Sequence, residues 1–289
     1  MSLSTWLSGA RPRTLTLSAV PVVLGTAAAQ HAGGANIGLA VLALLTALFL
    51  QVGVNYSNDY SDGVRGTDQF RVGPPRLTGS GAARPRMVLA VALAFFLLGA
   101  ASGLVLILLT QEWWLAAVGV AAIAAAWSYT GGSRPYGYAG LGEVAVFVFF
   151  GLVATVGTEY VQTKAFSVLG LISAAAAGFF ACAVLMVNNI RDIEPDRRAG
   201  KRTLAVKLGL RSARIAYGAL LAAPYVLAVV IVVTHPFAIL GVVSLPLTVR
   251  AFVLGTRSSK PLELITALKS TSFGALLFAI ALGLGLVLT

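Results

Sequence analysis

Two short polar segments hold most of the acidic side chains in this chain of 289 residues. They read NDYSDGVRGTD (58–68) and NNIRDIEPDRRAGKRT (188–203), and together they contain six of the ten Asp and Glu residues. Amide and carboxylate oxygens are ligands that hard divalent cations such as Mg²⁺ prefer, and Mg²⁺ usually keeps positions for phosphate oxygens. The two segments therefore predict sites for divalent cations that act on a phosphate-bearing substrate.

The oxygen-bearing side chains line up if each segment continues a helix. Residues three or four positions apart share one face of a helix. The first segment then presents Asn58 with Asp62, and the second presents Asn188, Asp192 and Asp196. Two such strips, facing each other, are expected to hold two or three ions. The simpler alternative is a set of capping residues and solvated loop charges, but matching clusters on two helices favour the metal interpretation.

Basic side chains follow both acidic segments. Arginine and lysine bind phosphate oxygens through charge-assisted hydrogen bonds. Metal ions would meet some oxygens of a diphosphate group, and the cationic side chains would meet the rest. The expected diphosphate contacts are Arg65, Arg71 and Arg76 after the first segment, and Lys201 and Arg202 after the second.

Long apolar runs recur along the whole chain, and these runs must position the polar segments. The composition is 58% hydrophobic and only 11% charged, against about 25% charged for a soluble domain. A transmembrane helix needs about 20 apolar residues. The sequence therefore predicts an all-α polytopic membrane protein with nine spans, at about 14–33, 36–56, 87–110, 113–130, 141–160, 166–190, 212–233, 236–255 and 266–288.

The positive charge is distributed to one side of these spans. All but one of the 21 Lys and Arg residues fall in alternate loops, and Lys164 is the exception. This asymmetry indicates a cytoplasmic N-terminus, cytoplasmic polar loops and an external C-terminus in the plasma membrane. The net charge of +11 is thus explained by membrane topology and indicates no nucleic acid partner. His31 and His235 fall in the outer loops, far apart in sequence, where a solvated role is expected for each.

The chain is expected to form a single domain over residues 1–289. The two acidic segments each follow the second helix of a four-helix set, which suggests a pseudo-repeat of 14–130 and 141–255 with a ninth helix at 266–288. A site between internal repeats is common in membrane proteins.

Several motifs resemble those of the UbiA-type intramembrane prenyltransferases. The two acidic segments match the two aspartate motifs of that family, and the second continues as KRTLAVKLG. Further matches are ARPRTLT (10–16), VGPPRLTGSG (72–81) and YTGGSRPYGYAGLGE (129–143). The similarity covers most of the chain in order. It is nearest to the branch that prenylates 1,4-dihydroxy-2-naphthoate, since Gly66 stands where much of the family has the last Asp of the first motif.

The resemblance implies nine helices around a central cavity and Mg²⁺-dependent transfer of a polyprenyl group from its diphosphate. Asp62 and Asp192 are then central to catalysis, and Arg134 falls where the family places a basic diphosphate contact. Metal ligands are expected among Asn58, Asp59, Asp62, Asp68, Asn188, Asn189, Asp192 and Asp196.

An aromatic acceptor requires its own contacts. Tyr129 and Tyr136 are expected to bracket the allylic cation or the acceptor ring, because aromatic faces stabilise cations. Arg11 and Arg13 are candidates to bind the acceptor carboxylate. Glu143 fits either a role at the start of its helix or proton transfer.

Other functions remain open at this stage. The acceptor can instead be 4-hydroxybenzoate, homogentisate or a non-aromatic alcohol. A cation transporter also uses membrane carboxylates. However, its acids are expected in the middle of the membrane, without adjacent Lys and Arg that repel a cation.

Overall fold

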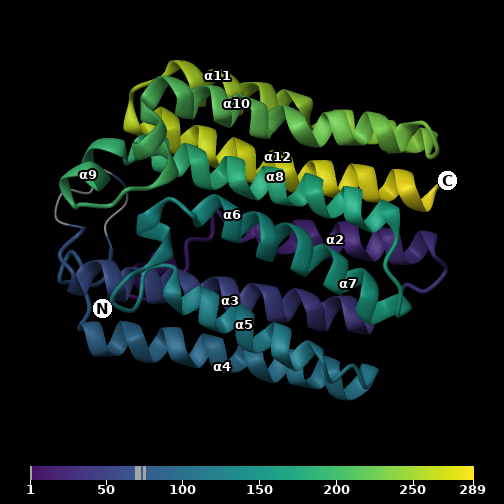
Figure 1. The fold of residues 1–289 in the computed structure, drawn as a ribbon, viewed down its shortest axis with the longest axis horizontal. Coiled ribbons are helices and arrows are strands. Elements are labelled where there is room, and N and C mark those ends of the chain that lie inside the picture. The colour runs from purple at the N-terminus through teal and green to yellow at the C-terminus, as the bar shows by residue number, and fades with distance from the viewer. Residues whose placement is uncertain (1, 69–72, 74–75) are drawn as a thin grey trace.

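The computed structural model describes residues 2–68, 73 and 76–289 and consists of helices and connecting loops over those ranges. The helices run roughly along one axis (Figure 1). Their bounds are α1 Leu3–Gly9, α2 Thr16–His31, α3 Ile37–Val64, α4 Pro85–Thr110, α5 Leu115–Ser128, η1 Tyr136–Ala139, α6 Gly142–Val146, η2 Phe147–Val153, α7 Ala154–Thr163, α8 Val168–Arg191, α9 Ile193–Arg198, α10 Leu204–Val232, η3 Pro236–Ser244, α11 Leu245–Arg257 and α12 Pro261–Val287.

Membrane-spanning length is reached by seven helices among the described residues. The α6–η2–α7 stretch and the η3–α11 stretch each count as one of these spans. Each of the nine predicted segments coincides with helix. However, α2 has 16 residues and α5 has 14, and both are shorter than the 18 residues taken as the minimum length of a membrane span. The all-α membrane fold is confirmed, whereas the exact count of nine spans is not.

The centre of the bundle is formed by α8 and α12. Within the apolar stretch of each span, 61% of α8 and 67% of α12 is buried inside the protein, against 17–33% for the other five spans. The sequence of α8 is rich in Ala and Gly, and small residues allow neighbouring helices to approach closely. Gly178 of α8 illustrates this, because Gly151 of η2 packs directly against its backbone. The α6–η2–α7 stretch, α10 and the η3–α11 stretch pack against this pair, whereas α3 and α4 pack mainly against each other. These outer spans leave much of their apolar surface exposed.

The two acidic segments lie at the same end of the bundle, opposite the C-terminus (Figure 1). Each contains the end of a helix, and the two helices stop in the same way. Thr67 donates its backbone N–H to Asp62 O, and Lys201 donates its backbone N–H to Asp196 O. The intervening Gly66 and Gly200 have φ of 73° and 75°, as the Schellman helix ending requires. These endings fix Asp62 and Asp196 in the last turns of α3 and α9.

Candidate active site

A cavity of about 1210 Å³ joins the two acidic segments to a long apolar groove. One face of α3 lines it from Asp62 to Ala43, with the lining positions three or four residues apart. That face is roughly 28 Å long, since an α-helix rises about 1.5 Å per residue. It is polar near Asp62 and mostly apolar beyond Gln51. Apolar side chains of α5, α7 and α8 complete the groove.

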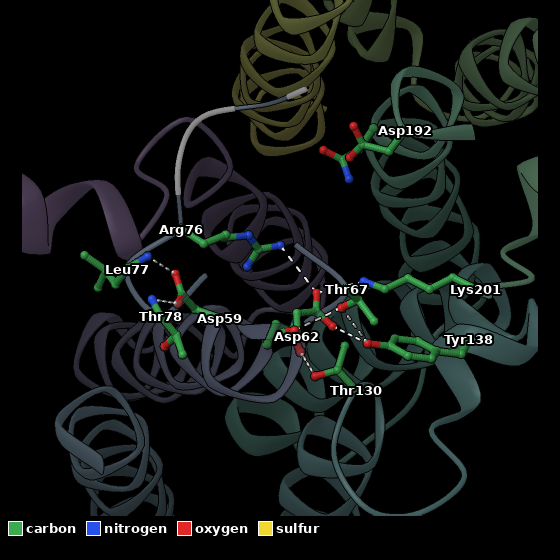
Figure 2. A network of polar contacts seen from close by, with 12 residues as sticks. Asp59, Asp62, Thr67, Arg76, Leu77, Thr78, Thr130, Tyr138, Asp192 and Lys201 are labelled. Carbon is green, nitrogen blue, oxygen red and sulfur yellow. Dashed lines mark hydrogen bonds and ion pairs between the residues drawn. The ribbon is translucent and has the colours of Figure 1, made fainter. Parts of the chain in front are cut away.

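Asp62 lies at the polar end and is surrounded by donors (Figure 2). Its Oδ2 is 2.9 Å from Lys201 Nζ and 3.8 Å from Arg76 Nη2, and Tyr138 donates its hydroxyl to Oδ1. The four side chains come from α3, the loop after α9, the loop before α4 and η1. Lys201 also lies 4.7 Å above the centre of the Tyr138 ring. The Asp62 and Lys201 side chains are only 4% and 11% exposed, so this ion pair is largely withdrawn from solvent.

Asp59 is one turn earlier on α3 and has different contacts. Its two oxygens accept the backbone N–H groups of Leu77 and Thr78 at 2.9 and 2.8 Å (Figure 2). Asp59 lines the cavity but is 1% exposed. Its carboxylate therefore holds the loop before α4. The neighbouring Asn58 faces the cavity, and its Oδ1 accepts the Thr130 hydroxyl at 2.7 Å.

Asp192 of the second acidic segment lies apart from Asp62 (Figure 2), and both line the cavity. Arg191 binds both oxygens of Asp192, at 2.7 and 2.5 Å, and also donates to Asn188 Oδ1 at 2.9 Å. Asp196 lines the cavity with them. Asn189 also lines the cavity, and its Nδ2 donates to Glu143 Oε1 at 3.1 Å. The Asn189 amide oxygen is thereby turned away from Glu143.

The donor set fits magnesium chemistry. Six predicted ligands share the polar end of the cavity: Asn58, Asp62, Asn188, Asn189, Asp192 and Asp196. Their ligand atoms are amide and carboxylate oxygens, which Mg²⁺ prefers. Within residues 2–68, 73 and 76–289, no three His, Cys, Asp or Glu side chains gather as a ready metal centre.

Some predicted residues are not on the cavity wall. Asp68 packs beside Gly79, Arg65 donates to Gly132 O and lies over Tyr138, and Arg202 and Arg134 have exposed side chains. The structure does not bring these four residues into the cavity. Arg71 lies outside the described residues.

The predicted aromatic and acceptor contacts do line the cavity. Tyr129 and Tyr136 meet edge to face, with ring centres 5.5 Å apart, and Tyr136 donates its hydroxyl to a backbone oxygen of α5. Burial raises the pKa of Tyr136 to about 12, so its ring stays neutral at physiological pH. Arg11 and Arg13 also line the cavity. Asn55 of α3 donates to Ala10 O and so fixes the segment that carries them.

Sequence reasoning missed the roles of Tyr138, Thr130 and Arg191. Tyr138 donates to Asp62, and burial with the charge of that carboxylate raises the Tyr138 pKa. Tyr138 and Thr130 belong to the YTGGSRPYGYAGLGE motif, and Arg191 lies inside the second acidic segment. Their presence in the motifs was the available signal, but nothing in the spacing linked them to particular acidic side chains.

The match to a family model decides the classification. Residues 18–273 match the model of the UbiA prenyltransferase family. The chain belongs to the UbiA prenyltransferase family. Among solved UbiA structures, a homologue from Archaeoglobus fulgidus bound to GPP and Mg²⁺ superposes with a TM-score of 0.66 at 19% identity, covering 99% of this chain and all of that one. An apo homologue from Aeropyrum pernix gives a TM-score of 0.67 at 18% identity, covering 94% of this chain and 97% of that one. These likenesses confirm the UbiA fold.

Curated UbiA relatives are similar over nearly the full chain. A 1,4-dihydroxy-2-naphthoate octaprenyltransferase from Mycobacterium tuberculosis is 51% identical over 97% of this chain and 96% of its own length. A protein of the same name from Escherichia coli is 35% identical over 98% of this chain and 95% of its own length.

Proposed function

We propose that this UbiA family member transfers a polyprenyl group from a polyprenyl diphosphate to 1,4-dihydroxy-2-naphthoate. Carbon dioxide and diphosphate leave, and demethylmenaquinol is formed. The observation that carries the proposal is the single cavity that joins acidic and basic side chains to an apolar groove along α3. The full-length similarity to relatives named for this acceptor supports the choice of substrate.

The groove is suited to a long prenyl tail. An extended polyprenyl tail advances about 1.2 Å per bond, which is the advance per backbone bond in an extended polypeptide. The roughly 28 Å of groove beside α3 then accommodates about six isoprene units, each with four bonds along the main chain. The rest of a longer tail can lie in the surrounding lipid.

The polar end binds the diphosphate. Of the basic residues predicted to contact the diphosphate, Lys201 and Arg76 line the cavity, and both pair with Asp62. The residues that would hold Mg²⁺ are Asn58 and Asp62 on one side and Asn188, Asn189, Asp192 and Asp196 on the other. When bound, Mg²⁺ would supply Lewis-acid neutralisation of the leaving diphosphate. Asp59 instead keeps its structural contacts to the loop before α4.

The remaining residues act on the organic partners. The carbon–oxygen bond of the prenyl diphosphate breaks, and its electron pair leaves with the diphosphate. The apolar walls keep water from the resulting allylic cation, and the Tyr129 and Tyr136 rings stabilise it. Arg11 and Arg13 bind the acceptor carboxylate. The acceptor ring forms the new carbon–carbon bond at its carboxyl-bearing carbon. That carboxylate then leaves as carbon dioxide and returns its bonding pair to the ring.

The reaction is placed at the cytoplasmic face of the plasma membrane. The arginines and lysines of the loops at the polar end support this orientation by the positive-inside rule. It puts the C-terminus outside. The two acidic segments have matching helix endings at Gly66 and Gly200, which supports a pseudo-repeat of residues 14–130 and 141–255.

The test uses the protein in bilayers with polyprenyl diphosphate, Mg²⁺ and 1,4-dihydroxy-2-naphthoate, with products identified by mass spectrometry. We expect a prenylated product that lacks the carboxyl group, and its loss with EDTA or in Asp192→Ala. Product from 4-hydroxybenzoate but not from the naphthoate would refute the acceptor and keep the reaction type. Absence of diphosphate release with either acceptor would refute prenyl transfer.

A further inference from the structure

The two histidines of the chain meet at the end of the bundle away from the acidic segments. His31 is the last residue of α2, and His235 lies between α10 and η3. They are 204 residues apart in sequence, yet their Nε2 atoms are 3.2 Å apart. The rings lie edge to face, with centres 4.5 Å apart. The expectation of two unrelated solvated imidazoles therefore misses a close pairing.

The Thr234 hydroxyl contacts the ring nitrogen of His235 that does not face His31. It is 2.7 Å from His235 Nδ1 and 3.3 Å from Ile231 O. A hydroxyl can accept a hydrogen bond from Nδ1 while it donates its own hydrogen to a carbonyl oxygen. In that arrangement the Nε2 lone pair of His235 is available on the side of His31. In many proteins a hydrogen-bond partner on the second ring nitrogen orients a metal-binding imidazole in this way.

The local field favours a cation between the rings. His31 ends α2, and the backbone N–H of His235 bonds to Ile231 O in the last turn of α10. The carboxyl end of a helix carries a partial negative charge that favours nearby cations. Two such ends meet here. Both imidazoles belong to exposed segments, so an ion can reach them from solution.

We propose that His31 and His235 form a binding site for a divalent transition-metal ion of the Zn²⁺ class. Imidazole nitrogens bind Zn²⁺ at about 2.0–2.1 Å, so two ligands of a tetrahedral ion lie about 3.3 Å apart. The Nε2 separation of 3.2 Å matches this spacing, and water would complete the coordination. The bound ion links the outer end of α2 to the α10–η3 connection. This proposal concerns binding alone and is independent of the proposed prenyl transfer.

The chain is well suited to a direct test because it has only two histidines. Tag-free protein with ¹⁵N-labelled histidine in lipid nanodiscs is titrated with ZnCl₂ and followed by NMR. We expect the Nε2 signals of both imidazoles to shift together, with saturation at one ion per chain. His31→Gln and His235→Gln should each weaken binding at least about 10-fold, and Thr234→Val about 10-fold through loss of the orienting partner.

The controls separate this site from surface adsorption. Gln30→Ala removes an exposed side chain beside His31 and should leave Zn²⁺ binding unchanged. Cys182→Ser, which replaces a buried thiol, should also leave Zn²⁺ binding unchanged. Imidazole signals that do not move, a shift of one ring only, or wild-type affinity in either single histidine variant would overturn the proposal.

Discussion

Lys201 provides the sharpest test of how the polar end binds diphosphate. Its ammonium lies 2.9 Å from Asp62, and its side chain is 11% exposed. A hydrogen bond to a charged group is worth about 1.5–3 kcal/mol, and the low exposure of Lys201 favours the upper part of that range. Lys201→Met should therefore lower kcat/KM for the polyprenyl diphosphate by roughly 30- to 160-fold, at about 1.36 kcal/mol per factor of ten.

The assay is steady-state release of diphosphate at saturating acceptor and Mg²⁺. Lys207→Met is the matched control, because Lys207 is on the same stretch of chain, is exposed and donates to Ala139 O. Its effect should be small. Lys201→Arg should restore part of the loss, since it retains the charge with a different shape. Equal kcat/KM values for Lys201→Met and Lys207→Met would refute the assignment of Lys201 to the diphosphate.

Three further variants test other parts of the site. Asp59→Asn replaces an acceptor oxygen with a donor against a buried backbone N–H. It should destabilise the fold by about 2 kcal/mol, as measured by thermal unfolding. The folded fraction should keep its Mg²⁺ requirement, as measured by Mg²⁺ titration of activity. Glu143→Met should raise the half-saturating Mg²⁺ concentration about 10-fold, because it releases Asn189. Glu143→Gln keeps an acceptor for Asn189, so its half-saturating Mg²⁺ concentration should stay near the wild-type value. An inactive Glu143→Gln variant with normal Mg²⁺ dependence would favour a proton-transfer role for Glu143 instead. Gly157→Phe places a ring in the apolar groove, where an added Cβ meets no atom within 4 Å. It should weaken the binding of long prenyl diphosphates by about 1–3 kcal/mol and that of geranyl diphosphate little. Equal losses of binding free energy with both substrates would contradict the position of the tail.

The fold and most of the site could be predicted from the sequence because both depend on short-range patterns. Apolar runs of membrane length mark the helices. The prediction that Asn188, Asp192 and Asp196 share one helix is wrong, because α8 ends at Arg191 and Asp196 belongs to α9, but all three side chains line the cavity. Ion pairing could not be predicted in this way. The contact between Lys201 and Asp62 depends on how α3 and the loop after α9 pack together, and no local pattern encodes that packing.

The same limit explains the residues whose placement differs from expectation. Asp59 and Asp62 are equivalent in spacing and in residue type, yet one holds backbone N–H groups and the other meets cationic side chains. What distinguishes them is the packing of other segments: Leu77 and Thr78 reach Asp59, whereas Lys201 and Tyr138 reach Asp62. Arg134 resembles a family diphosphate contact by motif, but its side chain is exposed and does not line the cavity.

On the proposed function, the sharing of Asp62 by Lys201 and Arg76 predicts that metal and diphosphate bind cooperatively. A divalent cation that takes Asp62 releases two basic side chains for the phosphate oxygens. A diphosphate that takes those side chains releases the Asp62 carboxylate for the cation. Each ligand thus removes a competitor of the other, and thermodynamic linkage requires the two enhancements to be equal. The apparent affinity for either ligand should therefore be expressed only at a stated concentration of the other.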